Sequence, residues 1–187
     1  MRAFLEGGYS GTTLEQIARE AQVSTATVFK HYRTKADIFG AIMSRVFGND
    51  DPSTWPPVTS GDPVEALTQI GRQYAATLRD ARIRALFRVM IAEVPRFPEL
   101  GQQLYERGKA PYLQRVEEHL RREVAAKRLA IPDVKLATRQ FLGMINDVVF
   151  WPHMLVVDLP DTDAEATRVI RGAARTLCAA YGAERAR

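Results

Sequence analysis

The sequence has little of several features that define other classes of protein. Its 187 residues include one cysteine, Cys178, which excludes an internal disulfide and fits a reducing compartment. No apolar run approaches the roughly 20 residues needed to cross a bilayer, and residues 1–10 lack the apolar stretch of a signal peptide. We therefore expect a cytoplasmic protein without a membrane partner.

The residues that catalysis would need are also sparse. The three histidines, His31, His119 and His153, are far apart, and none has zinc-ligand spacing to a cysteine or to another histidine. A nucleophile elbow and a phosphate-binding glycine loop are both missing from the sequence. We predict that the protein is not an enzyme and uses no metal or other cofactor.

Strand patterns are missing too, so the sequence predicts an all-α fold. The segments with regular hydrophobic spacing have helical periodicity, and none alternates as a half-buried strand would. The net charge of +4 permits a nucleic-acid partner. Residues 1–50, however, carry six basic and five acidic side chains, so their net charge is only +1. A DNA-binding role there must depend on where the basic residues lie.

The most informative positive feature is the segment from Thr12 to Tyr32, which has the pattern of two short helices joined by a tight turn. An apolar stripe and a Thr12–Glu15 capping box indicate the first helix. Ser24 can cap the second helix, which would bury Val28 and Tyr32, and Val23 would fill the turn. This pattern is typical of a helix-turn-helix, whose second helix enters the DNA major groove.

Further helices follow this segment. The Thr34–Asp37 pair predicts a capped helix, and residues 49–61 are rich in turn formers and predict a linker. We expect a DNA-binding domain at 1–48 and a helical second domain at 62–187. Helices are predicted from Asp62–Pro63, over 83–94, from 98 towards 127 with an interruption at 108–111, over 133–151 and over 162–181.

Residues 4–47 closely resemble the N-terminal domain of TetR-family transcriptional repressors. The rest of the chain resembles the family's helical ligand-binding and dimerisation domain more loosely, although 91–100 is similar to a segment of the efflux-regulator-like branch. The residues that carry the first resemblance are Phe4, Leu5, Glu6, Gly8, Tyr9, Thr12, Thr13, Leu14, Ile17, Ala18, Ala21, Val23, Ser24, Thr27, Val28, Phe29, Tyr32, Lys35, Asp37 and Phe39.

The resemblance implies a homodimer that places two such helices in successive major grooves of a palindromic operator of double-stranded DNA. A small molecule bound in the second domain would favour a spacing that releases the DNA. It also implies that Thr13 and Lys35 contact phosphate. The residues expected to face the groove are Thr25, Ala26, Thr27, Lys30 and His31, and Phe29 is counted with them among the DNA-binding residues.

The chain departs from the family pattern at three places. The family usually has glycine at the position of Ala26 and often has glycine at the position of Gln22. At the position of Phe29 the family usually has a tyrosine, whose hydroxyl reaches a phosphate. The chain also begins inside the family's first helix. We expect Met1 either to lie within a longer natural protein or to start a shortened helix, which would leave apolar surface exposed on later helices.

A ligand pocket in the second domain needs apolar walls and a few polar groups. A buried Asp147 would favour a cationic effector. The alternative is a regulator whose second domain binds no small molecule and only dimerises or binds a protein. The candidate lining residues are Tyr74, Phe87, Met90, Ile91, Tyr105, Met144, Asn146, Asp147, Phe150 and Trp151.

The last two helices carry many small residues, which permit close helix approach. We predict that they form a four-helix dimer interface with their copies in the partner; packing within one chain is the alternative. The residues assigned to this interface are Val169, Ile170, Ala173, Ala174 and Leu177.

Overall fold

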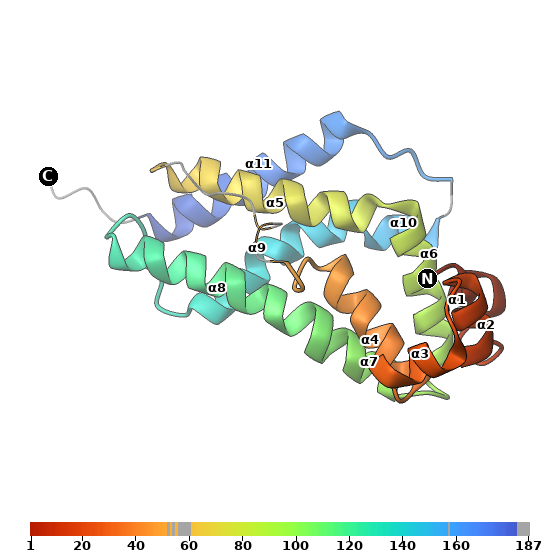
Figure 1. The fold of residues 1–187 in the computed structure, drawn as a ribbon. Helices are drawn as coiled ribbons and strands as arrows, with labels where there is room; N and C mark the ends of the chain where they lie inside the picture. The colour runs from red at the N-terminus through yellow and green to blue at the C-terminus, as the bar shows by residue number, and fades with distance from the viewer. Residues whose placement is uncertain (52, 54, 56–60, 157, 183–187) are drawn as a thin grey trace, which may run out of the picture. The chain divides into compact units, whose positions relative to one another are not determined.

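The computed structural model describes residues 1–51, 53, 55, 61–156 and 158–182, and it is built from helices (Figure 1). Among these residues the one β pairing is an isolated bridge between Leu129 and Gly182. The predicted all-α fold is confirmed. The helices are α1 Arg2–Gly7, α2 Leu14–Glu20, α3 Thr25–His31, α4 Lys35–Val46, α5 Pro63–Arg79, α6 Ala81–Glu93, α7 Glu99–Gln103, the π-helical η2 Leu104–Lys109, α8 Ala110–Ala125, α9 Val134–Val149, α10 Trp151–Leu155 and α11 Asp163–Tyr181.

The helices form two compact units that do not follow chain order. The first unit combines Met1–Pro52 with Ala81–Pro111, and the second combines Ser53–Asp80 with Tyr112–Arg187. Helices α6, α7 and η2 therefore pack with the N-terminal helices, although they follow α5 in the chain. The division into sequence domains at 1–48 and 62–187 stays a prediction.

Helices α2, α3 and α4 of the first unit begin at side-chain caps. Ser24 accepts from the Thr27 amide at 3.0 Å, and Thr34 forms a reciprocal capping box with Asp37, as predicted. The cap of α2 differs from the prediction: Thr13 caps it, paired with Gln16. Thr12 is only 2% exposed, and its hydroxyl reaches the Gly8 carbonyl at 2.6 Å. Because that hydroxyl is engaged inside the fold, it cannot cap α2.

An aromatic cluster joins α1 and α4 to the segment between α6 and α7. The Phe4 and Tyr9 rings stack at 5.8 Å, and both meet Phe39 edge-on. Phe97 packs on Tyr9 with ring centroids 5.1 Å apart. Offset and edge-to-face arrangements of this kind are favourable beyond the area that they bury. The cluster therefore holds the N-terminal helices on a scaffold that includes residues after α6.

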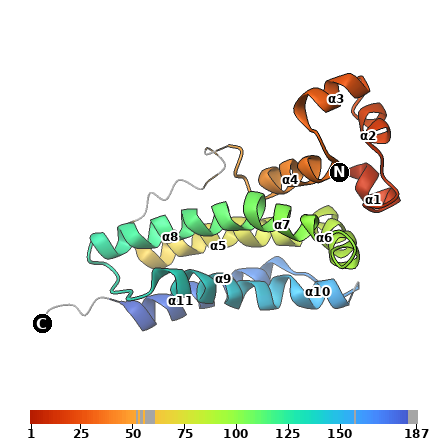
Figure 2. The same cartoon turned by 90° about the horizontal axis from the view of Figure 1, so that it is seen from below.

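Helix α4 lies along α7 and η2 in both views of the fold (Figures 1 and 2). The turn after α4 is fixed there by Asn49, whose side-chain amide donates to the carbonyls of Arg107 and Gly108 at 2.7 and 2.8 Å. Both carbonyls belong to η2, where the Ala110 amide bonds five residues back to Tyr105. The predicted interruption near 108–111 is thus a π-helical turn, and its carbonyls hold the end of α4.

In the second unit α5, α9 and α11 pack around Gly71, and Figure 2 shows α9 and α11 together on one side of α5. A Cβ atom at Gly71 would lie 2.7 Å from the Ile170 side chain and 3.0 Å from that of Ile145. The close approach of α5 to its neighbours therefore depends on this glycine. Tyr74 of α5 stacks on Tyr112 of α8 at 5.4 Å, which brings α8 into the same core.

Candidate nucleic-acid interface

The structure places α3 as a short helix attached to α2 through one buried face. Val28 is 7% exposed, and Tyr32, one turn later, is partly buried. The Ser24 cap and the Tyr32 amide, which donates to Val28 at 2.8 Å, define the two ends of the helix. These contacts fix the orientation of α3 and leave its opposite face open.

The open face contains the residues that were predicted to meet DNA. Ala26, Thr27, Phe29, Lys30 and His31 are all exposed, whereas Thr25 is partly buried beside the cap. The predicted groove-facing residues are therefore brought together on one helix. Their contact with DNA stays a prediction.

The turn between α2 and α3 corrects one prediction and explains one departure from the family. Val23 is 43% exposed, so it does not fill the turn as a buried support. Its backbone amide instead donates to the Ala18 carbonyl at 3.0 Å. Gln22 has a φ of 57°, in the left-handed region that favours glycine. A position where the family often has glycine is therefore occupied here by a residue in a less favourable conformation.

Of the two predicted phosphate contacts, Thr13 is exposed at the start of α2 and Lys35 is engaged within the protein. The Lys35 ammonium donates to the carbonyls of Tyr9 and Thr12 and lies 4.3 Å from the centre of the Tyr9 ring. Desolvation lowers its pKa, partly offset by Glu93 and Glu99. Lys35 thus holds the loop before α2 in place.

Sequence reasoning missed the polar contacts that connect this loop to α6 and α7. The Ser10 hydroxyl donates to Glu93 at 3.1 Å, and the Tyr9 hydroxyl donates to Glu99 at 3.4 Å. Burial, followed by the charge of Glu99, raises the pKa of Tyr9 to about 12, so the hydroxyl keeps its proton. Both glutamates lie in the segment 91–100, which the sequence analysis singles out only for its resemblance to the family.

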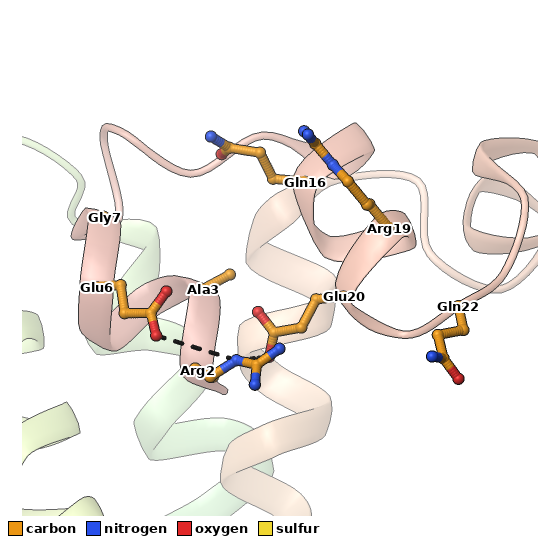
Figure 3. Close-up of a pocket in the computed structure, with 8 residues that line it drawn as sticks. All are labelled: Arg2, Ala3, Glu6, Gly7, Gln16, Arg19, Glu20 and Gln22. Carbon is orange, nitrogen blue, oxygen red and sulfur yellow. Dashed lines mark ion pairs between the residues drawn. The ribbon is translucent and has the colours of Figure 1, made fainter.

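A shallow hollow opens between α1 and α2 (Figure 3). Arg2 spans it, 3.5 Å from a Glu20 oxygen and 4.0 Å from a Glu6 oxygen. Mixed charges give the hollow no preference for an anion or a cation. Its lining contains none of the residues predicted to bind an effector; the lining residues are Arg2, Ala3, Glu6, Gly7, Gln16, Arg19, Glu20 and Gln22.

The predicted effector residues are divided between the two units and differ in burial. The exposed large apolar side chains of this set are Ile91 at 46%, Tyr105 at 53% and Trp151 at 47%. Asp147 is exposed as well, so it does not supply the buried carboxylate that would favour a cationic effector. Phe87, Met90, Ile91 and Tyr105 belong to the first unit, and Tyr74, Met144, Asn146, Asp147, Phe150 and Trp151 belong to the second.

Most residues assigned to the dimer interface lie inside the chain's own core. Ile170, Ala173, Ala174 and Leu177 are at most 3% exposed, and Val169 is partly buried. They belong to the α11 face that packs on α5 and α9, as Ile170 shows by its contact with Gly71. A second copy would therefore have to meet the opposite face of α11.

The first three helices contain a tight turn between α2 and α3, and α3 is capped and exposes one face. This arrangement defines a helix-turn-helix DNA-binding protein. Comparisons with known proteins agree. Residues 1–42 match the model of the TetR family of bacterial regulatory proteins, and residues 65–183 match that of the AefR-like transcriptional repressor C-terminal domain. The chain belongs to the TetR family of transcriptional regulators.

Solved structures of similar proteins cover nearly the whole chain. A TetR-family regulator from Mesorhizobium loti is 28% identical, with a TM-score of 0.82 over 97% of this chain and 92% of that one. The flavonoid-responsive regulator FrrA is 29% identical, with a TM-score of 0.76 over 99% and 93%. Bacillus subtilis FadR, solved with stearoyl-CoA, is 18% identical with a TM-score of 0.68 over 94% and 92%, and shows the fold alone.

Among curated proteins, the HTH-type transcriptional regulator YvkB of Bacillus subtilis is 29% identical over 112 residues. That match spans 56% of this chain and 58% of YvkB, so the chain matches little more than half of that relative. No helix in the described ranges is long and apolar enough to cross a membrane.

Proposed function

We propose that the protein is a ligand-responsive transcriptional repressor that binds a palindromic operator as a dimer and leaves it when a small molecule binds. The observation that carries the DNA-binding part is the open face of α3, where Ala26, Lys30 and His31 stand exposed on a helix that is capped and buried on its other side. The match of 65–183 to a repressor C-terminal domain supports the assignment as a repressor.

Buried polar groups in the second unit support a small-molecule effector. Within the described residues, Gln69 Oε1 and Thr138 Oγ1 are buried without a hydrogen-bond partner, and His119 Nε2 forms no hydrogen bond although it lies 3.7 Å from Glu123 Oε1. They lie on α5, α8 and α9, and buried polar atoms are rarely left unpaired. A ligand with both donor and acceptor groups would satisfy them. FrrA, by its name, responds to flavonoids, which carry such groups on an apolar frame.

For the dimer we propose the outward face of α9 and α11. Leu136 is 48% exposed, and Cβ atoms at Gly143 and Gly172 would meet nothing within 4 Å in the single chain. Because both helices are neighbours on one side of α5, a second copy could approach them closely at the two glycines. Gly172→Arg should shift the protein to monomer in sedimentation equilibrium, whereas an unchanged dimer would place the interface elsewhere.

DNA binding is tested with sequences enriched from a random duplex library and with labelled duplexes in fluorescence anisotropy. Lys30→Ala and His31→Ala should each weaken binding to the enriched site without lowering the unfolding temperature. Lys127→Ala removes the same charge as Lys30→Ala from an exposed turn of the second unit and serves as the matched control. If Lys30→Ala and Lys127→Ala bind the enriched site with equal affinity, Lys30 does not contribute to DNA binding.

The alternative is a regulator whose second domain binds no small molecule and only dimerises or binds a protein. A thermal-shift screen against apolar, cationic and flavonoid compounds separates the two, because a ligand that binds the folded state raises its apparent stability. A compound that both raises the unfolding temperature and releases DNA supports effector sensing. If no compound does both, the alternative is favoured; for a compound that does, Thr138→Val and His119→Phe should weaken the release of DNA.

A further inference from the structure

Helix α3 is unusual in what it exposes. Phe29 is 49% exposed, and Val23, just before the helix, is 43% exposed. None of the seven residues of α3 is an arginine, asparagine, glutamine, aspartate or glutamate. The side chains that make bidentate hydrogen bonds to guanine or adenine are therefore missing, apart from the single ammonium of Lys30.

The exposed apolar groups lie together on one side of the open face. Ala26 and Phe29 are three residues apart, so they are neighbours on the helix surface, about 4.5 Å apart along its axis. Val28 lies between them in sequence but faces the protein, 7% exposed. Lys30 is one turn from Ala26 and borders the apolar pair.

The one hydroxyl on the open face of α3 is already engaged. Thr27 Oγ1 lies 2.8 Å from Ser24 Oγ, whose oxygen also accepts from the Thr27 amide at 3.0 Å. The helix cap thus holds the Thr27 hydroxyl beside Ser24 at the start of α3. What α3 offers to a base edge is mainly a methyl group, an aromatic ring and two cationic or titratable side chains.

The 5-methyl group of thymine is the apolar feature that base pairs present in the major groove. We propose that Ala26 and Phe29 contact the methyl groups of thymines at neighbouring positions of each operator half-site, and that this contact specifies them. The proposal rests on the proposed DNA-binding function and names the class of sequence that the site selects. Lys30 then donates to a guanine next to the thymines.

The experiment removes only the methyl groups. A half-site is enriched from a random duplex library with the full-length protein, and each of its thymines is then replaced by deoxyuridine. Burial of one methyl group is worth about a fourfold change in equilibrium constant, which corresponds to ~0.8 kcal/mol. Deoxyuridine at a contacted position should therefore weaken binding about fourfold, and deoxyuridine outside the half-site should have no effect.

Variants connect the effect to the residue. In Phe29→Ala, deoxyuridine at the position that Phe29 contacts should no longer weaken binding, whereas in Lys30→Ala it should weaken binding as in the parent. Phe29 is exposed, so circular dichroism should show a folded protein in both variants.

Enriched half-sites without thymines, or a deoxyuridine effect that Phe29→Ala retains in full, would overturn the proposal while leaving DNA binding intact. Failure of any duplex to be enriched would overturn the proposed function and this inference with it.

Discussion

The two units of the molecule are stabilised in different ways. The first unit contains helices of six and seven residues, α1, α2 and α3, of which α2 and α3 begin at side-chain caps. The second contains α5, α9 and α11, with 16 to 19 residues and a continuous apolar face. Isolated helices shorter than about 12 residues are marginal in water. The short helices of the first unit therefore depend on polar contacts as well as on the aromatic cluster, whereas the second unit depends mainly on packing of long helices.

This difference also separates the two candidate functions. In the first unit polar groups are used in caps and in contacts such as Lys35 with the Tyr9 and Thr12 carbonyls, so that α3 can expose apolar groups. Among the described residues, buried polar side-chain atoms without a hydrogen-bond partner occur in both units, Gln103 Oε1 in the first and Gln69 Oε1 and Thr138 Oγ1 in the second. Those of the second unit lie on α5 and α9, within the unit that we propose to bind an effector.

The largest expected effect tests the core of the second unit. Ile170→Ala should lower the free energy of unfolding by about 2–5 kcal/mol, because Ile170 is 3% exposed and packs against Gly71. Urea denaturation measures the change. Because Ile170 packs within its own chain, the loss of stability should depend on protein concentration no more than the stability of the parent does. If the variant instead lost dimerisation at unchanged monomer stability, Ile170 would be assigned to the dimer interface.

A second prediction concerns the first unit, where the ammonium group of Lys109 is largely removed from water. Burial in η2 lowers the pKa of Lys109 from 10.5 to about 8. Between those values the unfolded chain binds more protons than the folded one, so stability rises with pH there and levels off above 10.5. Relative to Lys109→Met, the parent should gain up to roughly 3 kcal/mol from pH 8 to pH 10.5. Parallel pH profiles of the two proteins would contradict this assignment.

Two glycines of the second unit, Gly71 and Gly143, differ in how closely other side chains pack around them. Gly71→Ala should destabilise the protein by about 1–3 kcal/mol, because its Cβ would meet Ile170 and Ile145. Gly143→Ala adds the same methyl group in mid-helix where nothing lies within 4 Å, so in the monomer it should stabilise by about 0.5–1 kcal/mol. Guanidinium denaturation of both variants in the Gly172→Arg background, which we expect to be monomeric, measures the difference, and changes of the same sign would refute the packing argument.

Much of the fold could be predicted because caps and apolar periodicity are local signals. Ser24 and Thr34 are identified as caps from their neighbours alone, and the structure confirms both. Thr12 was misassigned because the rule on spacing also fits Thr13, and only tertiary contact with Ala3 and Gly8 distinguishes them.

The sites were less predictable because they depend on which face a helix turns inward. The small residues of α11 could have packed on α5 or on a partner, and periodicity does not distinguish the two. The hydrogen bonds of Lys35 to carbonyls 23 and 26 residues earlier likewise come from tertiary contact that the sequence does not reveal, and its phosphate contact stays a prediction. The exposed set on α3 was predictable because the buried positions Val28 and Tyr32 determine the opposite face.

The smallest expected effect concerns the cap on which α3 depends. Ser24→Ala removes the acceptor for the Thr27 amide and should lower the free energy of unfolding by about 1 kcal/mol. Ser24→Asn keeps an oxygen that can cap, so it should restore most of that stability. Because a frayed α3 no longer holds Ala26 and Phe29 in register, Ser24→Ala should also weaken operator binding more than Ser24→Asn does. If alanine and asparagine variants were equal in both measurements, the cap would not be what positions the recognition surface, and the buried contacts of Val28 would have to do so alone.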